Sequence, residues 1–537
     1  MPRLLNRLVE EAALRQPGAP AIRADGETLS YEQLARSANG LARVLVGTGT
    51  ARGDRVAVWL ARGPNVPVSF YGVLAAGGTL VPIDPRSPIE QVVRILRATG
   101  STRIVSEPER SESISRALAD CPEVSHAIGL GQDAGVAVPC VPWTTVLEEA
   151  CDRPPDVPVI ELDPAYILHT SGSTGVPKLI LHTHYSAMSF VNWAAAEYSL
   201  TSDDRLTNHS SHHTCFATFD YYAAARSGAT TVILTPAVLM MPGSLSALLE
   251  RERISVWYSV PAALVQLSLR GDLEARDLRS IRWVLFAGET FPGKHLRRIR
   301  QQLPGARFSH VYGSTEVNVC TCYHLPETGE PVGPLPIGRA CSTTRTLVAD
   351  SALQPVSDGE VGDLLIRGST VMSGYWGDAE RNEQVLVRRP APGGLDEVYF
   401  RTGDRARVLA DGNLAFVARA DRQVKVRGHR VELEEVEAAL LSLASVEEAA
   451  VFTVPDEEGS SALRAAAVAG AGAPPTEREI LADLRRILPP YALPSNITFV
   501  ESMPRTPTGK VDVKALLERE TAAQTTARTT AKRHDGE

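Results

Sequence analysis

The pattern of apolar and polar positions in the first part of the chain predicts helices and strands in alternation. Between Tyr31 and Leu45, apolar residues recur every three or four positions, which is the spacing of one face of a helix. Apolar runs at 54–60 and 79–84 predict buried strands, and the segment 66–74 between them predicts a helix. Because a strand, a helix and a second strand of these lengths form a βαβ unit, we expect layers of parallel sheet.

Short apolar runs that predict further buried strands lie at 166–169, 230–234, 255–258 and 283–286. From residue 359 onward the pattern changes to strands separated by turns, at 362–368 and 406–418. This part of the sequence predicts a β-rich end to the large domain.

A compact α+β pattern begins after residue 420. Its predicted elements are a strand at 423–426, a helix at 432–443, a strand at 448–454 and a helix at 476–488. The sequence after 520 is polar and of low complexity, which favours disorder. We therefore predict an α/β fold with a large N-terminal domain at 1–420, a small mobile α+β domain at 421–520 and a disordered tail at 521–537.

Composition narrows the class of protein. The 537 residues are 44% hydrophobic and 22% charged, with a formal net charge of −8, as in ordinary globular proteins. We expect a cytoplasmic location, because no run of about 18 apolar residues and no signal-peptide core occurs. Seven scattered cysteines, an odd number, favour reduced thiols over a disulfide framework. The mild acidity argues against nucleic acid as the main partner.

The segment from Thr170 to Lys178 carries the strongest chemical signal. It reads Thr-Ser-Gly-Ser-Thr-Gly-Val-Pro-Lys and directly follows a predicted strand. Glycines let backbone N–H groups approach an anion, hydroxyl groups donate hydrogen bonds, and a lysine adds positive charge, so the loop is suited to binding phosphate. It is not the Walker pattern, because the spacing from Gly172 to Lys178 differs and Leu179 stands where Ser or Thr would follow.

Further motifs follow in order along the chain, including Val311-Tyr-Gly-Ser-Thr-Glu316 and Pro504-Arg-Thr-Pro-Thr-Gly-Lys510. The full set lies at 29–34, 75–84, 170–178, 311–316, 359–364, 399–404, 419–433, 488–491 and 504–510. Together these segments resemble the adenylate-forming superfamily, and within it the stand-alone amino-acid adenylation enzymes of nonribosomal peptide synthesis. The resemblance implies a ligase that activates a carboxylate with ATP and Mg²⁺, releases pyrophosphate and transfers the acyl group to a phosphopantetheine thiol.

The resemblance also implies which residues bind the nucleotide. The β- and γ-phosphates would be held by Thr170, Ser171, Gly172, Ser173, Thr174, Gly175 and Lys178. Glu316, next to Thr315 in the same motif, would bind Mg²⁺, since a hard dication prefers carboxylate oxygen. The adenosine would be contacted by Tyr312 and Gly313 at the base, by Asp404 and Arg419 at the ribose, and by Phe416 near adenine. Packing within a strand explains Phe416 nearly as well.

The resemblance implies that Lys510 acts in the first half-reaction, the formation of the acyl-adenylate. There it would bridge the substrate carboxylate and the α-phosphate of ATP. An aimed cation stabilises the negative charge that gathers during displacement at phosphorus. Asp421 resembles the hinge residue of the family. Rotation about it would exchange Lys510 for the strand that carries Lys425, with Gly428 lining the pantetheine tunnel.

The substrate pocket departs from the family pattern. Counting back from Ser227-Gly-Ala229 places the usual Phe-Asp pair at Thr214-Cys215, so Cys215 replaces the aspartate that pairs with an α-ammonium group. Asp220, five residues on, falls in the next helix and need not substitute. The other implied lining residues are His213, Phe216, Phe219, Tyr258, Leu285, Ala287, Val311, Val319 and Cys320, with Lys510 facing the carboxylate.

Two substrate classes stay open. One is a small apolar amino acid such as proline or alanine, which the remaining pocket residues favour because they resemble those of stand-alone prolyl-adenylating enzymes. The other is an aryl or acyl acid without an α-amine, which Cys215 favours because a buried ammonium without an ion-pair partner is costly.

The sequence also leaves open which thiol accepts the activated acyl group. No carrier-protein motif follows Val513, so we expect a carrier protein in trans, and free coenzyme A is the alternative. A non-catalytic binding module is disfavoured, because it has no chemical need for Glu316, Asp404, Lys425 and Lys510 together. The histidines and cysteines at 182–184, 209–213 and 320–322 match no zinc-site spacing, so we expect them to be structural or to form pocket walls.

Overall fold

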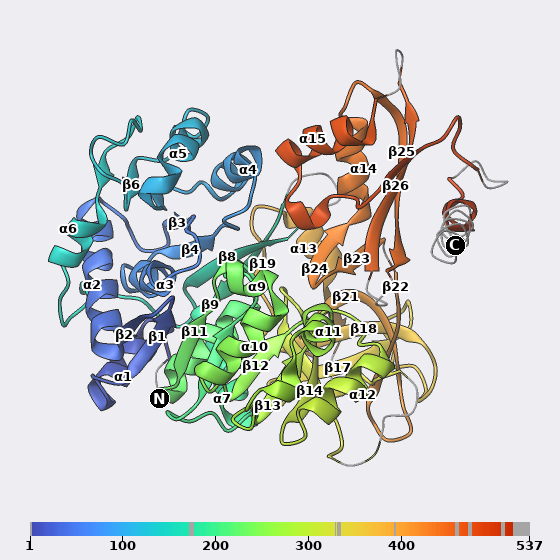
Figure 1. Ribbon diagram of the computed structural model, residues 1–537, viewed down its shortest axis with the longest axis horizontal. Helices are drawn as coiled ribbons and strands as arrows, with labels where there is room; N and C mark the ends of the chain where they lie inside the picture. The colour runs from blue at the N-terminus through green and yellow to red at the C-terminus, as the bar shows by residue number, and fades with distance from the viewer. Residues whose placement is uncertain are drawn as a thin grey trace. The chain divides into compact units, whose positions relative to one another are not determined.

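The computed structural model describes residues 3–170, 177–327, 329, 334–390, 394–420, 422–456, 461–470, 475–505 and 511–518. These described residues form two compact units, one up to residue 420 and the other from Arg422. Figure 1 colours the first unit from blue to orange and the second from orange to red. The predicted tail at 521–537 lies outside the described residues.

The first unit contains a mixed sheet, here named sheet A, whose middle strands are parallel. Its order is β16-β15-β14-β13-β12-β10-β11-β1-β2, and β14–β15, β15–β16 and β1–β2 pair antiparallel. The strands are β1 (Pro20–Ala24), β2 (Glu27–Ser30), β10 (Arg205–Asn208), β11 (Thr230–Ile233), β12 (Val256–Ser259), β13 (Trp283–Phe286), β14 (Arg307–Ser314), β15 (Asn318–His324) and β16 (Arg339–Ala340).

A second sheet of the same unit, sheet B, contains the predicted βαβ units. Its order is β19-β9-β8-β4-β3-β5-β6-β7, and β3 pairs in parallel with both β4 and β5. The strands are β3 (Arg55–Val58), β4 (Thr79–Pro82), β5 (Arg103–Val105), β6 (His126–Ile128), β7 (Cys140–Val141), β8 (Pro164–Thr170), β9 (Lys178–Thr183) and β19 (Gly374–Tyr375).

Helices cover both sheets of the first unit (Figure 1). They are α1 (Arg7–Arg15), α2 (Tyr31–Gly47), α3 (Asn65–Ala75), α4 (Ile89–Thr99), α5 (Ser111–Leu118), α6 (Trp143–Glu148), α7 (His184–Glu197), α8 (Ala224–Ser227), α9 (Pro236–Met240), α10 (Pro242–Arg251), α11 (Pro261–Arg270), α12 (Gly293–Gln302) and α13 (Ala379–Val385). Shorter turns are η1 (Pro108–Arg110), the π-helix η2 (Thr218–Ala223) and η3 (Leu273–Ala275). Capping boxes at Ser30 and Thr183 begin α2 and α7.

Strand alternation divides the hydrophobic core of this unit into layers. In β13, Trp283 and Leu285 join a core shared with α2, α3 and α7, whereas Val284 and Phe286 join a core shared with α10–α12. In β3, Val56 belongs to the shared core and Ala57 faces α4 and α5. Since successive side chains of a strand point to opposite faces, α2, α3 and α7 lie between the two sheets.

The unit ends in an antiparallel sheet, sheet C, as the strand-and-turn pattern after residue 359 predicts. Its order is β17-β18-β21-β20, with β22 paired to β21. The strands are β17 (Thr344–Ala349), β18 (Gly362–Gly368), β20 (Leu386–Pro390), β21 (Asp396–Val408) and β22 (Leu414–Arg419).

The second unit is a small α+β domain. Its elements are β23 (Gln423–Val426), β24 (His429–Glu432), α14 (Leu433–Leu441), β25 (Val446–Pro455), β26 (Ser461–Ala469), α15 (Glu477–Ile487), η4 (Pro490–Ala492) and β27 (Ile497–Phe499). A capping box between Thr476 and Glu479 begins α15 at the predicted position. The mixed α/β class predicted from the sequence is confirmed. None of the helices in the described part of the chain has the length and apolar character needed to cross a membrane.

Candidate active site

The segment predicted to bind phosphate connects two adjacent strands of sheet B. Thr170 ends β8, Lys178 begins β9, and the two residues pair in antiparallel register. The Thr170 hydroxyl is buried and has no hydrogen-bond partner among the described residues. The predicted phosphate ligands Ser171, Gly172, Ser173, Thr174 and Gly175 lie outside the described residues, so their role stays a prediction.

Glu316 lies in the turn between β14 and β15 and is completely buried, with 0% of its surface exposed. The Tyr375 hydroxyl donates a 2.8 Å hydrogen bond to its carboxylate. The backbone N–H of Met372 donates to the Glu316 carbonyl at 2.7 Å. These contacts fix both the backbone and the carboxylate of Glu316.

Pairing within sheet B brings Glu316 next to the strand that leaves the phosphate loop. Tyr375 on β19 pairs with Ile180 on β9. The ring N–H at Nε2 of His182, also on β9, donates to the Thr315 carbonyl at 2.8 Å. Two independent contacts thus connect the predicted metal ligand to the predicted phosphate loop.

A second polar group lies where sheet A meets sheet C. Arg419 Nη1 and Asp404 Oδ1 form an ion pair at 2.6 Å, and the Tyr312 hydroxyl donates to the other carboxylate oxygen of Asp404. Asp404 and Arg419 are register partners on β21 and β22. Burial, together with the Asp404 charge, raises the pKa of Tyr312 well above its usual value, so Tyr312 remains a donor. The structure brings together three of the five residues that the resemblance assigns to adenosine.

Two other residues predicted near adenine differ in their surroundings. A Cβ atom on Gly313 would lie 1.7 Å from the Asn318 carbonyl oxygen, so the tight β14–β15 hairpin admits only glycine there. Phe416 on β22 is 43% exposed, so it is not packed into the strand core.

Most residues predicted to line the substrate pocket share one hydrophobic core, in which Tyr258, Leu285 and Ala287 lie close to the carboxyl ends of β12 and β13. One core cluster contains Phe219, Tyr258, Leu285, Ala287, Val311 and Val319, with Cys215 and Phe216 partly buried against it. The Tyr258 ring lies 4.5 Å from the Phe216 ring and 5.4 Å from the Phe219 ring, centroid to centroid. Cys215 lies near Tyr166 and Tyr258. The carboxyl ends of parallel strands are where ligands bind in open α/β sheets.

Asp220 does not provide the carboxylate that Cys215 lacks. It belongs to the π-helix η2, is 1% exposed and accepts a 2.9 Å hydrogen bond from the side-chain amide of Asn208. Burial raises the pKa of Asp220 well above its usual value, which favours a neutral carboxyl group. A neutral, internally bonded side chain offers no counter-charge to an ammonium group.

Two further predicted pocket residues have other neighbours. Cys320 belongs to a core beside sheet C and its thiol donates to the Tyr312 carbonyl at 3.5 Å. His213 is buried, stacks on His169 with centroids 5.2 Å apart and lies 3.8 Å from Asp84. Burial acts to raise the pKa of Asp84, but His213 and Arg86 outweigh it and hold that pKa well below its usual value.

Sequence reasoning missed Tyr375 and underestimated His182. A tyrosine after Ser373-Gly374 carries no local signal for a contact with a glutamate 59 positions earlier. His182 was expected to be structural, and its position directly after the predicted phosphate loop was the available clue. Pairing of β19 with β9 brings Tyr375 to Glu316, and His182 reaches Thr315 from β9 itself.

Three predicted residues belong to the second unit or lie outside the described residues. Lys425 lies on β23 in the second unit, where it pairs with Arg430 of β24. Arg427 and Gly428, both with positive φ, form the turn between these strands. Asp421 and Lys510 lie outside the described residues, so the hinge and the first-step lysine stay predictions.

The layered sheets and the two polar groups form the arrangement expected of a nucleotide-binding α/β enzyme. The AMP-binding enzyme family model matches residues 9–376, and the model of the AMP-binding enzyme C-terminal domain matches residues 435–510. The chain therefore belongs to the AMP-binding enzyme family, and it is an ATP-dependent ligase. The predicted superfamily and enzyme class are confirmed.

Similar proteins cover nearly the whole chain. The L-proline--[L-prolyl-carrier protein] ligase of Pseudomonas fluorescens is 32% identical over 521 residues, which are 96% of this chain and 99% of the relative. The ligase with the same description from Streptomyces coelicolor is 33% identical and covers 95% of both chains. Among solved structures, the amide bond synthetase McbA from Marinactinospora thermotolerans matches with a TM-score of 0.82, 26% identity and 95% and 99% coverage of the two chains.

Proposed function

We propose that this protein activates a small apolar amino acid of the proline type with ATP and transfers it to the phosphopantetheine thiol of a carrier protein. The aminoacyl-adenylate is the intermediate, and pyrophosphate leaves in the first step. The observation that carries the proposal is the apolar core that contains Tyr258, Leu285, Ala287, Val311 and Val319. Full-length similarity to two prolyl-carrier protein ligases supports the same substrate class and acceptor.

Glu316 and the nearby Ser314 fit Mg²⁺. The carboxylate is fully buried, and the Ser314 hydroxyl, two residues earlier, is buried without a hydrogen-bond partner among the described residues. Carboxylate and hydroxyl oxygens are hard donors of the kind that Mg²⁺ prefers. Bound Mg²⁺ would offset the negative charge of the triphosphate. Glu316 would hold it, while Tyr375 keeps the carboxylate oriented.

The group of Tyr312, Asp404 and Arg419 suits the adenosine part of ATP. The Asp404 carboxylate accepts hydrogen bonds, which is what the two ribose hydroxyls require. Arg419 and Tyr312 hold that carboxylate in one orientation. We assign Lys510 to the adenylation step, Lys425 to the transfer step and Asp421 to the hinge between the two states, on the family resemblance.

A second candidate is a ligase for an aryl or acyl acid without an α-amine. It is favoured by Cys215, which replaces the expected carboxylate, and by Asp220, whose carboxyl group is bonded to Asn208. An α-ammonium group would then rely on neutral partners, at a cost if it is buried.

The experiment that separates the two candidates is ATP–pyrophosphate exchange with a matched pair of acids. L-Proline and cyclopentanecarboxylic acid have the same ring size and differ by the amine. Exchange with L-proline and little with the carbocycle is the expected result. Exchange that is equal or stronger with cyclopentanecarboxylate or benzoate would establish the second candidate instead.

The acceptor is tested after the substrate is known. We expect the preferred acid to load onto a holo carrier protein, and an apo carrier protein that lacks the phosphopantetheine arm is the matched control. Formation of a free acyl-CoA, or of an amide with an added amine, would replace the carrier protein in the proposal.

A further inference from the structure

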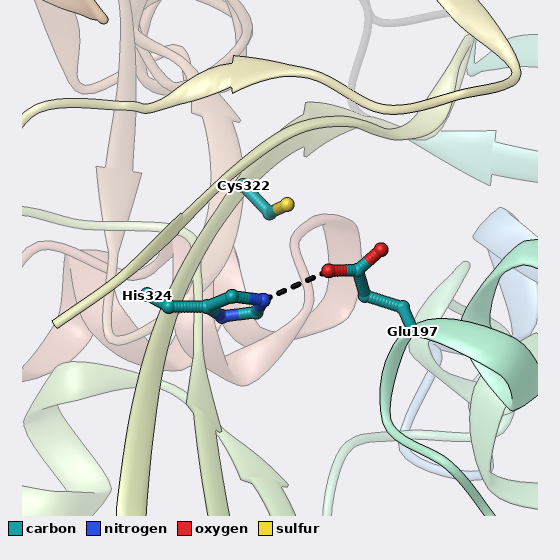
Figure 2. A group of neighbouring side chains, drawn as sticks. All are labelled: Glu197, Cys322 and His324. Atoms are coloured by element: carbon teal, nitrogen blue, oxygen red, sulfur yellow. Dashed lines mark hydrogen bonds and ion pairs between the residues drawn. The ribbon is translucent and has the colours of Figure 1, made fainter.

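A group of three metal-ligating side chains lies outside the proposed active site. Glu197 ends helix α7, while Cys322 and His324 lie two positions apart on β15 and therefore on the same face of that strand (Figure 2). One oxygen, one sulfur and one nitrogen atom from these residues lie within 4.8 Å of one another. His324 Nε2 and Glu197 Oε1 are 2.8 Å apart.

The three donor atoms favour a zinc-type cation over Mg²⁺ and Ca²⁺. Thiolate sulfur, imidazole nitrogen and carboxylate oxygen are the ligands of Zn²⁺ in proteins, whereas Mg²⁺ and Ca²⁺ bind oxygen. In a tetrahedral zinc site, neighbouring nitrogen and oxygen ligands are about 3.3 Å apart. The His324–Glu197 pair would open by about half an ångström to accept the ion.

The surroundings of His324 suit a metal ligand. Nδ1 lies 3.0 Å from the Ser309 hydroxyl, which in turn lies 3.1 Å from the Tyr198 hydroxyl. In the 2.8 Å contact Nε2–H donates to the Glu197 carboxylate. Metal binding would move the ring proton to Nδ1, where the Ser309 oxygen accepts it, and leave the Nε2 lone pair for the ion. Such outer hydrogen bonds orient ligating imidazoles in established metal sites.

The group is open to ions from solvent, and neighbouring side chains pack against it. About 30% of the His324 side chain and 32% of the Glu197 side chain are exposed, which leaves an entry path. The His324 ring packs against Trp283 with centroids 5.0 Å apart. The Cys341 thiol contacts the Cys322 thiol, so a second sulfur lies next to the group.

We propose that Glu197, Cys322 and His324 bind one zinc-type divalent cation. Binding converts the Cys322 thiol to a thiolate and releases its proton to solvent, and no electron is transferred. The local sequence hides the site, because Glu197 is 127 positions from His324.

The ion would join the end of α7 to β15 beside the substrate pocket. The Tyr198 ring lies 6.1 Å from the His324 ring and 6.0 Å from Phe219, which belongs to the pocket cluster. The role inferred for the metal is therefore structural: it fixes one wall of the pocket without touching the substrate.

The test is a Co²⁺ titration of the full-length, tag-free protein, with all thiols reduced and no nucleotide present. One equivalent of Co²⁺ should produce a thiolate-to-cobalt absorption band, and Zn²⁺ should displace it. Cys322→Ser should abolish the band, and His324→Gln and Glu197→Gln should each weaken binding at least tenfold. The matched control is Cys140→Ser, a half-buried cysteine on β7, which should bind as the wild type does.

Sulfur coordination and stability give independent readouts. X-ray absorption of the zinc-loaded protein should show sulfur among the ligands, and Zn²⁺ should raise the Tm of the wild type but not of Cys322→Ser. A reduced protein without the band, or a band that persists in a folded Cys322→Ser variant, would overturn the proposal.

Discussion

The Tyr375 hydroxyl donates a 2.8 Å hydrogen bond to the completely buried carboxylate of Glu316. The two residues are 59 positions apart and come from different sheets. A buried carboxylate needs oriented donors or a cation to remain ionised. Tyr375 supplies one such donor, which orients the carboxylate of the predicted metal ligand.

Tyr375→Phe removes that donor and keeps the ring. Because residues that orient a metal ligand typically contribute 10- to 100-fold to metal affinity or activity, we expect kcat/KM in pyrophosphate exchange to fall by about that factor. The Mg²⁺ concentration needed for half-maximal exchange should rise. Tyr185→Phe, at an exposed position on α7, is the control and should leave both quantities unchanged. A normal Mg²⁺ dependence in Tyr375→Phe would show that this hydroxyl does not orient a metal ligand.

The sequence alone predicts the local elements of the first unit well. The apolar run at 283–286 coincides with β13, because parallel strands are buried on both faces and read as continuous apolar segments. The spacing from Tyr31 predicts α2, which its capping box confirms. The boundaries of an element are predicted less accurately where polar residues continue a strand. For example, β21 begins at Asp396, ten positions before the strand predicted at 406.

Contacts between distant segments could not be predicted from the residues. The pairing of β19 with β9 places Tyr375 at Glu316, and His182 reaches Thr315 from 133 positions away. Neither contact has a sequence spacing that would reveal it. The family resemblance of the motifs predicted the group of Tyr312, Asp404 and Arg419. The strand register of β21 and β22 explains how Asp404 and Arg419 meet.

Cys215→Asp tests whether the missing carboxylate sets the substrate. A new carboxylate near Tyr258 would pair with an α-ammonium group, and a hydrogen bond to a charged group contributes about 1.5–3 kcal/mol. We expect the ratio of kcat/KM for L-proline to that for cyclopentanecarboxylate to rise at least about tenfold. Cys215→Ser, which adds no charge, should leave the ratio near that of the wild type. An unchanged ratio in Cys215→Asp would mean that position 215 does not face the amine.

Lys510→Ala separates the two half-reactions. Removing a cation that stabilises developing charge costs about 10²–10³-fold, so pyrophosphate exchange should fall by at least that factor. Transfer to the carrier protein from a chemically prepared adenylate should keep its wild-type rate, because Lys510 is assigned to adenylation alone. Lys514→Ala, at an exposed position, is the matched control for both assays. Equal loss of both half-reactions in Lys510→Ala would contradict the assigned role.

Five buried histidines predict a steep loss of stability in mild acid. Burial lowers the pKa of His169, His182 and His184 to about 4 and that of His209 and His212 to about 3, from an ordinary value near 6.5. Below pH 6.5 the unfolded chain therefore binds more protons than the folded one, and stability falls as pH falls. Each histidine contributes about 1.4 kcal/mol per pH unit between its two pKa values.

The five together would give a slope of about 7 kcal/mol per pH unit. Asp220, whose raised pKa acts in the opposite direction, reduces this slope to about 5–6 kcal/mol per pH unit, against a typical total stability of about 5–15 kcal/mol. Cooperative unfolding should thus begin below about pH 6 and finish above pH 4. Urea unfolding followed by circular dichroism at several pH values measures the slope. His209→Gln removes one titrating group and should flatten it by about 1.4 kcal/mol per pH unit, whereas His126→Gln, at a partly exposed site, should change it far less. A free energy of unfolding that stays constant from pH 7 to pH 5 would show that these histidines are protonated in the folded protein.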